Sequence, residues 1–178
     1  MEIWKESKIL YDGDVVRLRT GSVTLDDGRT ANREVVEHPG GVCVVPFTGD
    51  SVVLVRQFRI AVGDYVDELP AGKLEAHDTD PEARGRAELE EEAGYTAGTM
   101  VYVGHIFSSI GFCSEKIHIY LALDLTKTRQ RLEPDERIEL VEVPLAQVRH
   151  GLRAHAFQDA KTAVGLQALL YHLESSPS

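Results

Sequence analysis

The chain has 178 residues, 43% of them hydrophobic, and a formal net charge of −10. This length and apolar content suit a single folded domain and exclude a disordered chain. The apolar runs are too short to span a bilayer, the first residues lack the features of a signal peptide, and the negative charge would repel nucleic-acid phosphates. We therefore expect neither a membrane nor a nucleic-acid partner. Because two cysteines make no disulfide scaffold, we expect a cytoplasmic protein.

The first third of the chain predicts β-strands. Apolar and polar residues alternate over residues 16–20, and an Asp-Gly turn at residues 26–29 leads into a return strand at residues 33–38. Two further apolar runs, at residues 42–47 and 51–59, are separated by a short turn. We expect these two runs to pair as a central hairpin.

The rest of the chain predicts a helix, further strands and two closing helices. Asp80 and Pro81 are typical of a helix start, and Gly94 is typical of a helix end, so we expect this helix over residues 81–93. Gly85 inside it costs about 1 kcal/mol relative to Ala, which indicates a packing role. Strands are predicted at residues 100–107, 116–125 and 137–143, and helices at residues 144–151 and 158–173. This order predicts an α+β fold or an α/β/α sandwich with a mixed β-sheet.

The negative charge is concentrated in one segment. Residues 75–92 contain eight acidic residues and two arginines, so they carry −6 of the net charge of −10. Within the predicted helix, Glu88, Glu91 and Glu92 have the i, i+3, i+4 spacing that places side chains on one face. Such runs are usually solvated helix faces, but a bound divalent cation would remove the mutual repulsion of these carboxylates. Oxygen-only ligands favour Mg²⁺ or Mn²⁺ over zinc.

The segment from Gly72 to Tyr95 resembles the signature of the Nudix hydrolases, G-x5-E-x7-R-E-U-x-E-E-x-G-U, where U is a bulky aliphatic residue. Its core, Glu88-Leu89-x-Glu91-Glu92-x-Gly94, matches position for position. The segment is one residue longer between its glycines, and it has Asp78 for the first Glu, Ala87 for the Arg and Tyr95 for the last aliphatic residue. In the family this Arg orients the catalytic carboxylates. Either Arg84 or Arg86 is a candidate to replace it, although Arg86 lies about 100° round the helix from the Ala position.

The resemblance extends to the ADP-ribose pyrophosphatase branch of this family and spans about residues 11–170. It rests on further motifs at Glu34–Gly40, Val55–Arg59, Glu68–Gly72, Gly111–Lys116 and Asp135–Glu139. The resemblance implies a Nudix-type α/β/α sandwich with an N-terminal antiparallel β-sheet, in a homodimer that exchanges this sheet. We therefore expect an N-terminal dimerisation region at residues 1–40, a Nudix hydrolase domain at residues 41–174 and a flexible tail at residues 175–178.

The same resemblance implies roles for individual residues. The metal-binding positions are Ala71, through its carbonyl, Glu88, Glu91 and Glu92, with Mg²⁺ as the expected ion and Mn²⁺ as its substitute. The catalytic positions are Glu91, Glu92 and Glu136. Of these, Glu136 is the expected general base, with Glu133 and Glu139 as alternatives. The substrate-binding positions are Glu34, Arg56, Arg59, Gly72, Glu75 and Gly111.

Arg56 and Arg59 cannot both share the active-site face of a regular strand, because three positions separate them. The resemblance favours Arg59 for a substrate phosphate, which the fork of a guanidinium group matches well. Arg56 either assists in binding the substrate or pairs with a carboxylate.

The function implied by the resemblance is the Mg²⁺-dependent hydrolysis of ADP-ribose to AMP and ribose 5-phosphate, or of a related nucleoside diphosphate sugar. GDP-mannose or another nucleotide sugar is the main alternative substrate, because the signature recognises the diphosphate and not the groups attached to it. A non-catalytic nucleotide-binding sensor is an alternative of another class. Ala87 favours the sensor, whereas the three retained helix carboxylates oppose it.

Overall fold

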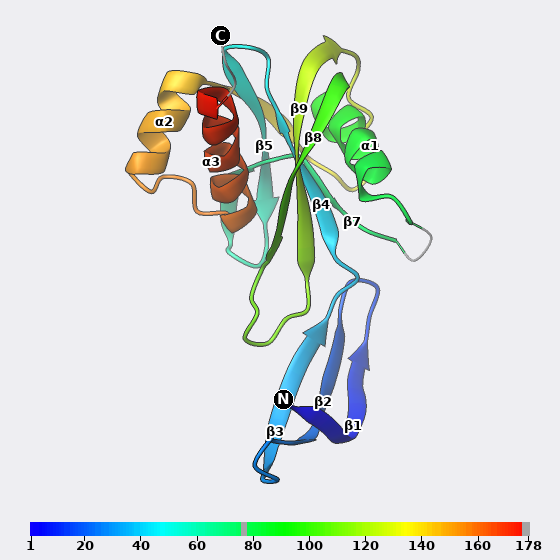
Figure 1. Cartoon of the computed structure of the whole chain (residues 1–178). Coiled ribbons are helices and arrows are strands. Elements are labelled where there is room, and N and C mark those ends of the chain that lie inside the picture. Colours follow the sequence, from blue (N-terminus) through cyan, green and yellow to red (C-terminus); the bar gives the residue numbers. More distant parts are fainter. Residues whose placement is uncertain (76–77, 176–178) are drawn as a thin grey trace. The chain divides into compact units, whose positions relative to one another are not determined.

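The computed structural model of the chain describes residues 1–75 and 78–175 (Figure 1). These residues form two compact units, one of residues 1–40 with 107–116 and the other of residues 41–106 with those from 117 onward. Within the described ranges, no helix is both long and apolar enough to cross a membrane. The predicted tail lies outside the described residues except for Ser175, which ends the last helix.

The first unit contains an antiparallel sheet in which β2 (Arg17–Thr24) lies between β1 (Ile3–Asp12) and β3 (Thr30–Glu37). The predicted turn and return strand are confirmed, because β2 pairs with β3 and the Leu25 N–H donates to the Arg29 carbonyl at 2.8 Å. β1 was not predicted. Its side chains are almost all exposed, so it lacks the apolar alternation that identifies a half-buried strand.

The strands of the second unit form a mixed sheet and an antiparallel sheet. In the mixed sheet, β4 (Gly41–Pro46) pairs in parallel with β9 (Lys116–Lys127) and antiparallel with β7 (Ala71–Lys73). The fourth strand, β8 (Tyr95–Phe107), lies next to β9 at the far edge. The mixed sheet therefore ends, on its other edge, in the short strand that carries the first residues of the Nudix-like segment.

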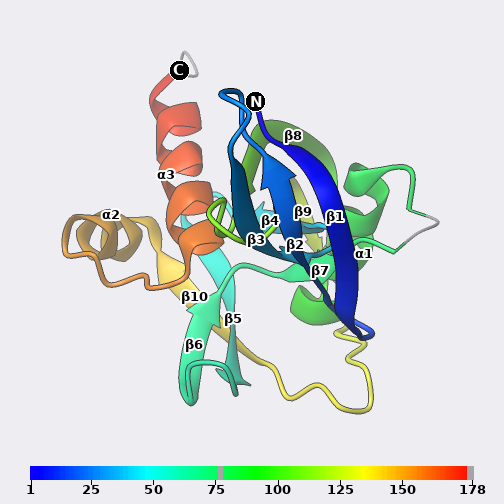
Figure 2. The same ribbon diagram turned by 90° about the horizontal axis from the view of Figure 1, so that it is seen from below.

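In the antiparallel sheet, β5 (Ser51–Arg59) lies between β6 (Asp64–Glu68) and β10 (Glu139–Pro144). Figure 2 shows these three strands from below. The prediction that residues 42–47 and 51–59 form a central hairpin is wrong, because β4 and β5 belong to different sheets. An isolated bridge from Phe47 to Val52 joins their ends. β4 and residues 51–55 of β5 are buried on both faces, which is the pattern of interior strands, so each strand takes its own partners on both edges.

Helices cover both sides of these sheets. α1 (Pro81–Ala93) packs on β4, β5 and β7, and α2 (Leu145–Arg153) and α3 (Ala160–Ser175) pack on the opposite side (Figure 1). The fold is therefore α+β, with the predicted α/β/α layering around a mixed sheet.

β4 connects the two layers of the core. Val44 belongs to a cluster with Leu89 of α1, whereas Cys43 and Val45 belong to a cluster with Leu166 of α3. Successive side chains of a strand point to opposite faces, so a strand without polar residues can be buried on both sides. This double burial fixes the position of α1 relative to the sheets of its unit.

α1 begins and ends as predicted. Asp80 Oδ1 accepts a hydrogen bond from the Glu82 N–H at 3.0 Å, and Gly94 ends the helix in the left-handed conformation at φ +69°. The packing role of Gly85 is confirmed as well. It is buried, and a Cβ there would lie 3.1 Å from Val42 Cγ2, so glycine allows α1 to approach β4 closely.

Gly94→Ala is expected to destabilise the protein more than Gly63→Ala. The φ angles of these glycines, +69° and +72°, each cost an L side chain about 1–2 kcal/mol. A Cβ at Gly94 would also lie 2.9 Å from the backbone N of Gln130, whereas a Cβ at Gly63 would meet no described atom within 4 Å. Urea unfolding should show a further loss of about 1–3 kcal/mol for Gly94→Ala. Equal losses would contradict the close approach at the end of α1.

Candidate active site

Elements of the second unit surround an acidic pocket of about 340 Å³. It gathers every predicted site residue except Glu34, Arg56 and Gly111. Among the residues that line it, six are acidic and three are basic, so a bound cation would offset the excess of negative charge. The lining residues are Gln57, Arg59, Ala71, Gly72, Lys73, Glu75, Arg84, Glu88, Glu91, Glu92, Glu133 and Glu136.

Glu88 and Glu92 lie one turn apart on the buried face of α1, and each is only 4% exposed. Glu92 Oε2 accepts a hydrogen bond from the Ala71 N–H at 2.8 Å. Glu88 Oε1 is buried, and its partner among the described residues is the Arg84 guanidinium. Burial disfavours the charged form of a carboxylate, and it raises the pKa of Glu88 to about 7 and that of Glu92 to about 8.

The backbone of β7 runs directly beside these carboxylates. A Cβ on Gly72 would overlap Glu88 Oε1, so a side chain does not fit at this position. Ala71 pairs with Cys43 of β4 and binds Glu92 through its N–H. These contacts hold residues 71 and 72 against α1. They explain why a strand that contains a glycine lies beside the acidic face of the helix.

Arg84 is the arginine that contacts the acidic face of α1. Its guanidinium forms an ion pair with Glu88 one turn further along the helix, and its Nη1 lies 4.0 Å from Glu91 Oε2. Arg86 instead pairs with Glu82, with its Nη2 2.9 Å from Oε1. Of the two candidates to replace the arginine of the signature, Arg84 therefore has the contacts that this role needs.

Arg59 joins the pocket from the end of β5 with a buried carboxylate as its partner. Its Nε and Nη2 donate to Glu68 Oε1 and Oε2 at 2.7 and 3.0 Å. Glu68 also binds Lys161 of α3. Neither partner was predicted. The Glu68–Gly72 motif offered a signal for Glu68, whereas a single lysine near the start of a helix offers none.

The loop before β10 brings acidic side chains to the pocket. Glu133 and Glu136 line it, and Glu136 Oε2 accepts a hydrogen bond from the Glu133 N–H at 2.8 Å. Beyond the effect of burial, the negative charge of Glu136 helps to raise the pKa values of Glu88 and Glu92. Glu139, the third candidate for the base, begins β10 and lines a different pocket.

Arg56 also lies outside the acidic pocket. Its Nε and Nη2 donate to Asp67 Oδ1 and Oδ2 at 2.6 and 2.8 Å, so it makes the carboxylate pair that was its alternative role. Together with Glu139 and Phe157, Arg56 lines a separate pocket of about 570 Å³.

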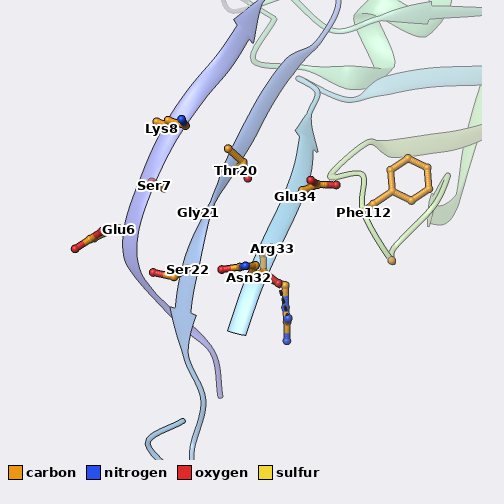
Figure 3. A pocket seen from close by; sticks show the side chains of 11 residues that line it. Glu6, Ser7, Lys8, Thr20, Gly21, Ser22, Asn32, Arg33, Glu34 and Phe112 are labelled. Carbon is orange, nitrogen blue, oxygen red and sulfur yellow. Dashed lines mark hydrogen bonds between the residues drawn. The ribbon is translucent and has the colours of Figure 1, made fainter. Parts of the chain in front are cut away.

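Glu34 and Gly111 belong to the first unit. There they line a wide groove of about 860 Å³ together with Arg33 and Phe112. Figure 3 shows side chains of β1, β2 and β3 along this groove, with Phe112 on the loop beside β3. Its lining is polar for the most part, and hydroxyl, amide and charged groups are available for hydrogen bonds.

The donor atoms of the acidic pocket suit a hard divalent cation. Glu88 and Glu92 offer buried carboxylate oxygens, and the described lining contains no His or Cys. In the described ranges, no three His, Cys, Asp or Glu side chains are already grouped closely enough to hold a metal ion. The chemistry of the pocket, and not a preformed cluster of ligands, therefore suits a divalent cation. Such a cation would remove the cost of ionising two buried carboxylates.

Comparisons with known proteins identify the family to which the chain belongs. A family model described as the NUDIX domain matches residues 37–163. The chain is 36% identical over 163 residues to an ADP-ribose pyrophosphatase of Bacillus subtilis, which covers 90% of this chain and 88% of the relative. It is 33% identical over 183 residues to a GDP-mannose pyrophosphatase of Cronobacter sakazakii. This match covers 95% of this chain and 94% of the relative. A crystal structure of an ADP compounds hydrolase shares the fold, with a TM-score of 0.84 at 18% identity over 97% of this chain and 94% of that one.

The metal-free protein is expected to lose stability as the pH rises from about 5 to about 9. Glu88 and Glu92 have ordinary pKa values of 4.5 but values of about 7 and about 8 in the folded chain. The stability that they contribute is therefore complete below pH 4.5 and is lost as the pH rises through the folded values. Thermal melts across this range should show a smaller decline for Glu92→Gln than for the wild type.

Glu90→Gln is the matched control, because Glu90 lies on the same helix outside the pocket and pairs with Arg131. It should keep the decline of the wild type. Added Mg²⁺ should raise the melting temperature at high pH for the wild type and for Glu90→Gln, and much less for Glu92→Gln. Identical pH profiles for the wild type and Glu92→Gln would contradict the buried-carboxylate account.

Proposed function

The chain belongs to the Nudix family of hydrolases, and we propose that it hydrolyses the diphosphate linkage of ADP-ribose, or of a related nucleoside diphosphate sugar. With ADP-ribose, water attacks one phosphorus, the bond to the bridging oxygen breaks, and AMP and ribose 5-phosphate leave. The observation that carries this proposal is that one pocket holds both the buried carboxylates of α1 and the Arg59 guanidinium. Such a pocket suits a diphosphate accompanied by a cation.

We propose Mg²⁺ as the metal ion, with Mn²⁺ able to replace it. Glu88, Glu91, Glu92 and the Ala71 carbonyl would hold it, because they supply the oxygen ligands that these ions prefer. When bound, the ion would polarise the phosphoryl oxygens and lower the pKa of the attacking water. Arg84 would orient Glu88 through their ion pair.

Arg59 is proposed to bind a phosphate of the substrate. Its Nε and Nη2 are engaged by Glu68, and its Nη1 forms no hydrogen bond within the described part of the chain. The Nη1 donors therefore remain available for a phosphoryl oxygen. Gly72 and Glu75 line the same pocket and are proposed to complete the diphosphate site.

Glu136 is proposed as the general base that takes the proton of the attacking water. Its place in the acidic pocket supports this role, and Glu139 lacks that support because it lines another pocket. Glu133 stays the nearer alternative, since it lines the acidic pocket from the same loop.

We further propose a cytoplasmic homodimer with residues 1–40 as its dimerisation region. Apolar side chains of β1, among them Ile3, Leu10 and Tyr11, are exposed in the single chain, and burying them against a second copy would be favourable. Glu34 and Gly111 are proposed to contact the nucleoside half of the substrate. The free cysteines are in keeping with a reducing compartment.

GDP-mannose is the second candidate substrate, and the relative from Cronobacter sakazakii favours it. The acidic pocket recognises a diphosphate and offers no direct contact that distinguishes one attached sugar from another. The sensor hypothesis loses its main support, because Arg84 pairs with Glu88 despite the Ala at position 87.

Turnover of a substrate panel tests the proposed function. Release of phosphate, after digestion of the products by phosphatase, would be measured for ADP-ribose, GDP-mannose, ADP-glucose, NADH and a capped RNA, with and without Mg²⁺. We expect Mg²⁺-dependent turnover with ADP-ribose preferred. Glu92→Gln should lower kcat by about 100-fold or more, because it removes a charged ligand, whereas Glu90→Gln should not. Saturable binding of ADP-ribose without turnover of any compound would contradict the enzyme and favour the sensor.

Glu136→Gln tests the assignment of the base. The variant should lower kcat by about 100-fold and remove the acidic limb of the pH–rate profile, because no group then accepts the proton of water. Glu139→Gln serves as the control and should change kcat little. If Glu133→Gln has the larger effect and Glu136→Gln keeps the wild-type profile, the base is Glu133.

A further inference from the structure

Four charged side chains form a chain of ion pairs that ends at the acidic pocket. Arg59 binds Glu68 through two hydrogen bonds. Lys161 Nζ lies 2.5 Å from Glu68 Oε2 and 3.0 Å from Asp159 Oδ2. Two cations and two anions alternate in this order, so the group as a whole is neutral and each carboxylate has a cation beside it.

The inner members of this chain are removed from water. The side chain of Glu68 is 4% exposed and that of Lys161 is 11% exposed. Burial by itself would lower the pKa of Lys161, but Asp159 and Glu68 outweigh it and the pKa is raised. Burial would likewise raise the pKa of Glu68, but Arg59 and Lys161 lower it. Both groups are therefore charged at neutral pH, and each depends on its partner.

The start of α3 is attached to the backbone that leads into β7. Thr162 Oγ1 accepts a hydrogen bond from the Leu69 N–H at 2.9 Å and donates to Asp159 Oδ2. Asp159 Oδ2 also accepts the Thr162 N–H at 3.0 Å. Lys161 thus projects from a fixed turn of helix, so its ammonium group is a fixed point against which Glu68 is held.

Arg59 depends on this arrangement for its orientation. It is the last residue of β5 and its side chain is 44% exposed, so by itself a long side chain at this position would sample many rotamers. The two hydrogen bonds to Glu68 select one orientation. Glu68 Oε2 receives both Arg59 Nη2 and Lys161 Nζ, so the lysine fixes the carboxylate that in turn fixes the arginine.

We propose that Lys161 is a positioning residue, which acts through Glu68 to hold the Arg59 guanidinium where it binds a substrate phosphate. This inference rests on the proposed function, because that function assigns Arg59 to the diphosphate. Lys161 itself lies outside the lining of the acidic pocket, so its effect on the substrate passes through its neighbours.

Substrate kinetics of Lys161→Met provide the first test. Loss of the ammonium group should raise KM for the preferred substrate by about tenfold and change kcat by less than about threefold. The reason is that the hydrogen bond from Arg59 to the substrate phosphate is weakened, whereas the chemical step is not affected. Lys161→Arg keeps the cation and should restore most of the affinity. Arg149→Met removes the ion pair between Arg149 and Glu174 of α3, away from the pocket, and should leave KM unchanged.

A double-mutant cycle separates positioning from general damage to the fold. If Lys161 acts through Arg59, then adding Lys161→Met to Arg59→Ala should raise KM no further. A further rise of about tenfold in that background would overturn the proposal, as would a wild-type KM for Lys161→Met.

The Nε–H signal of Arg59 in nuclear magnetic resonance spectra tests the geometry without turnover. It would be assigned by its loss in Arg59→Ala, and Lys161→Met should shift it and accelerate its exchange with water. An unchanged signal would overturn the positioning role even if KM had risen. Absence of turnover in the wild type, by contrast, would refute the proposed function, and the Arg59 signal would still decide whether Lys161 fixes the guanidinium.

Discussion

The burial of two carboxylates, Glu88 and Glu92, is the constraint on which the rest of the site depends. Ionising both of them within the packed side of α1 is unfavourable unless positive charge lies close by. Three neighbouring groups accommodate or bind these carboxylates. Gly72 leaves the space that Glu88 occupies, the Ala71 N–H binds Glu92, and Arg84 pairs with Glu88. Stability alone does not explain two acidic residues here, whereas a cation-binding pocket does.

The remaining architecture holds the groups that complete this pocket. β4 packs on α1 through one face and on α3 through the other, so both helices are positioned by the same strand. α1 supplies the carboxylates. α3 does not line the pocket, but its first turn is tied to Glu68 and through it to Arg59. The sandwich thus places the acidic side chains of α1 and the Arg59 guanidinium, to which we assign the substrate phosphate, around a single pocket.

The local features of the fold and the site could be predicted from the sequence. Asp80, Gly94 and the i, i+3, i+4 carboxylates act within a few residues, and α1 follows from them. Partners distant in the sequence could not be predicted. β4 takes β9 as its parallel neighbour instead of the adjacent apolar run, and the contact between Glu68 and Lys161 spans 93 residues. The sequence left both Arg84 and Arg86 as replacements for the arginine of the signature, and only the side-chain contacts distinguish them.

The most direct test of the central claim is a crystal structure with Mn²⁺ and an α,β-methylene analogue of ADP-ribose, which binds but is not cleaved. Anomalous scattering locates the metal independently of the assumed chemistry. We expect Mn²⁺ within coordination distance of Glu88, Glu92 and the Ala71 carbonyl, with the bridged phosphonates on Arg59. Mn²⁺ bound elsewhere, with Glu88 and Glu92 still buried and without a cation, would contradict the central claim.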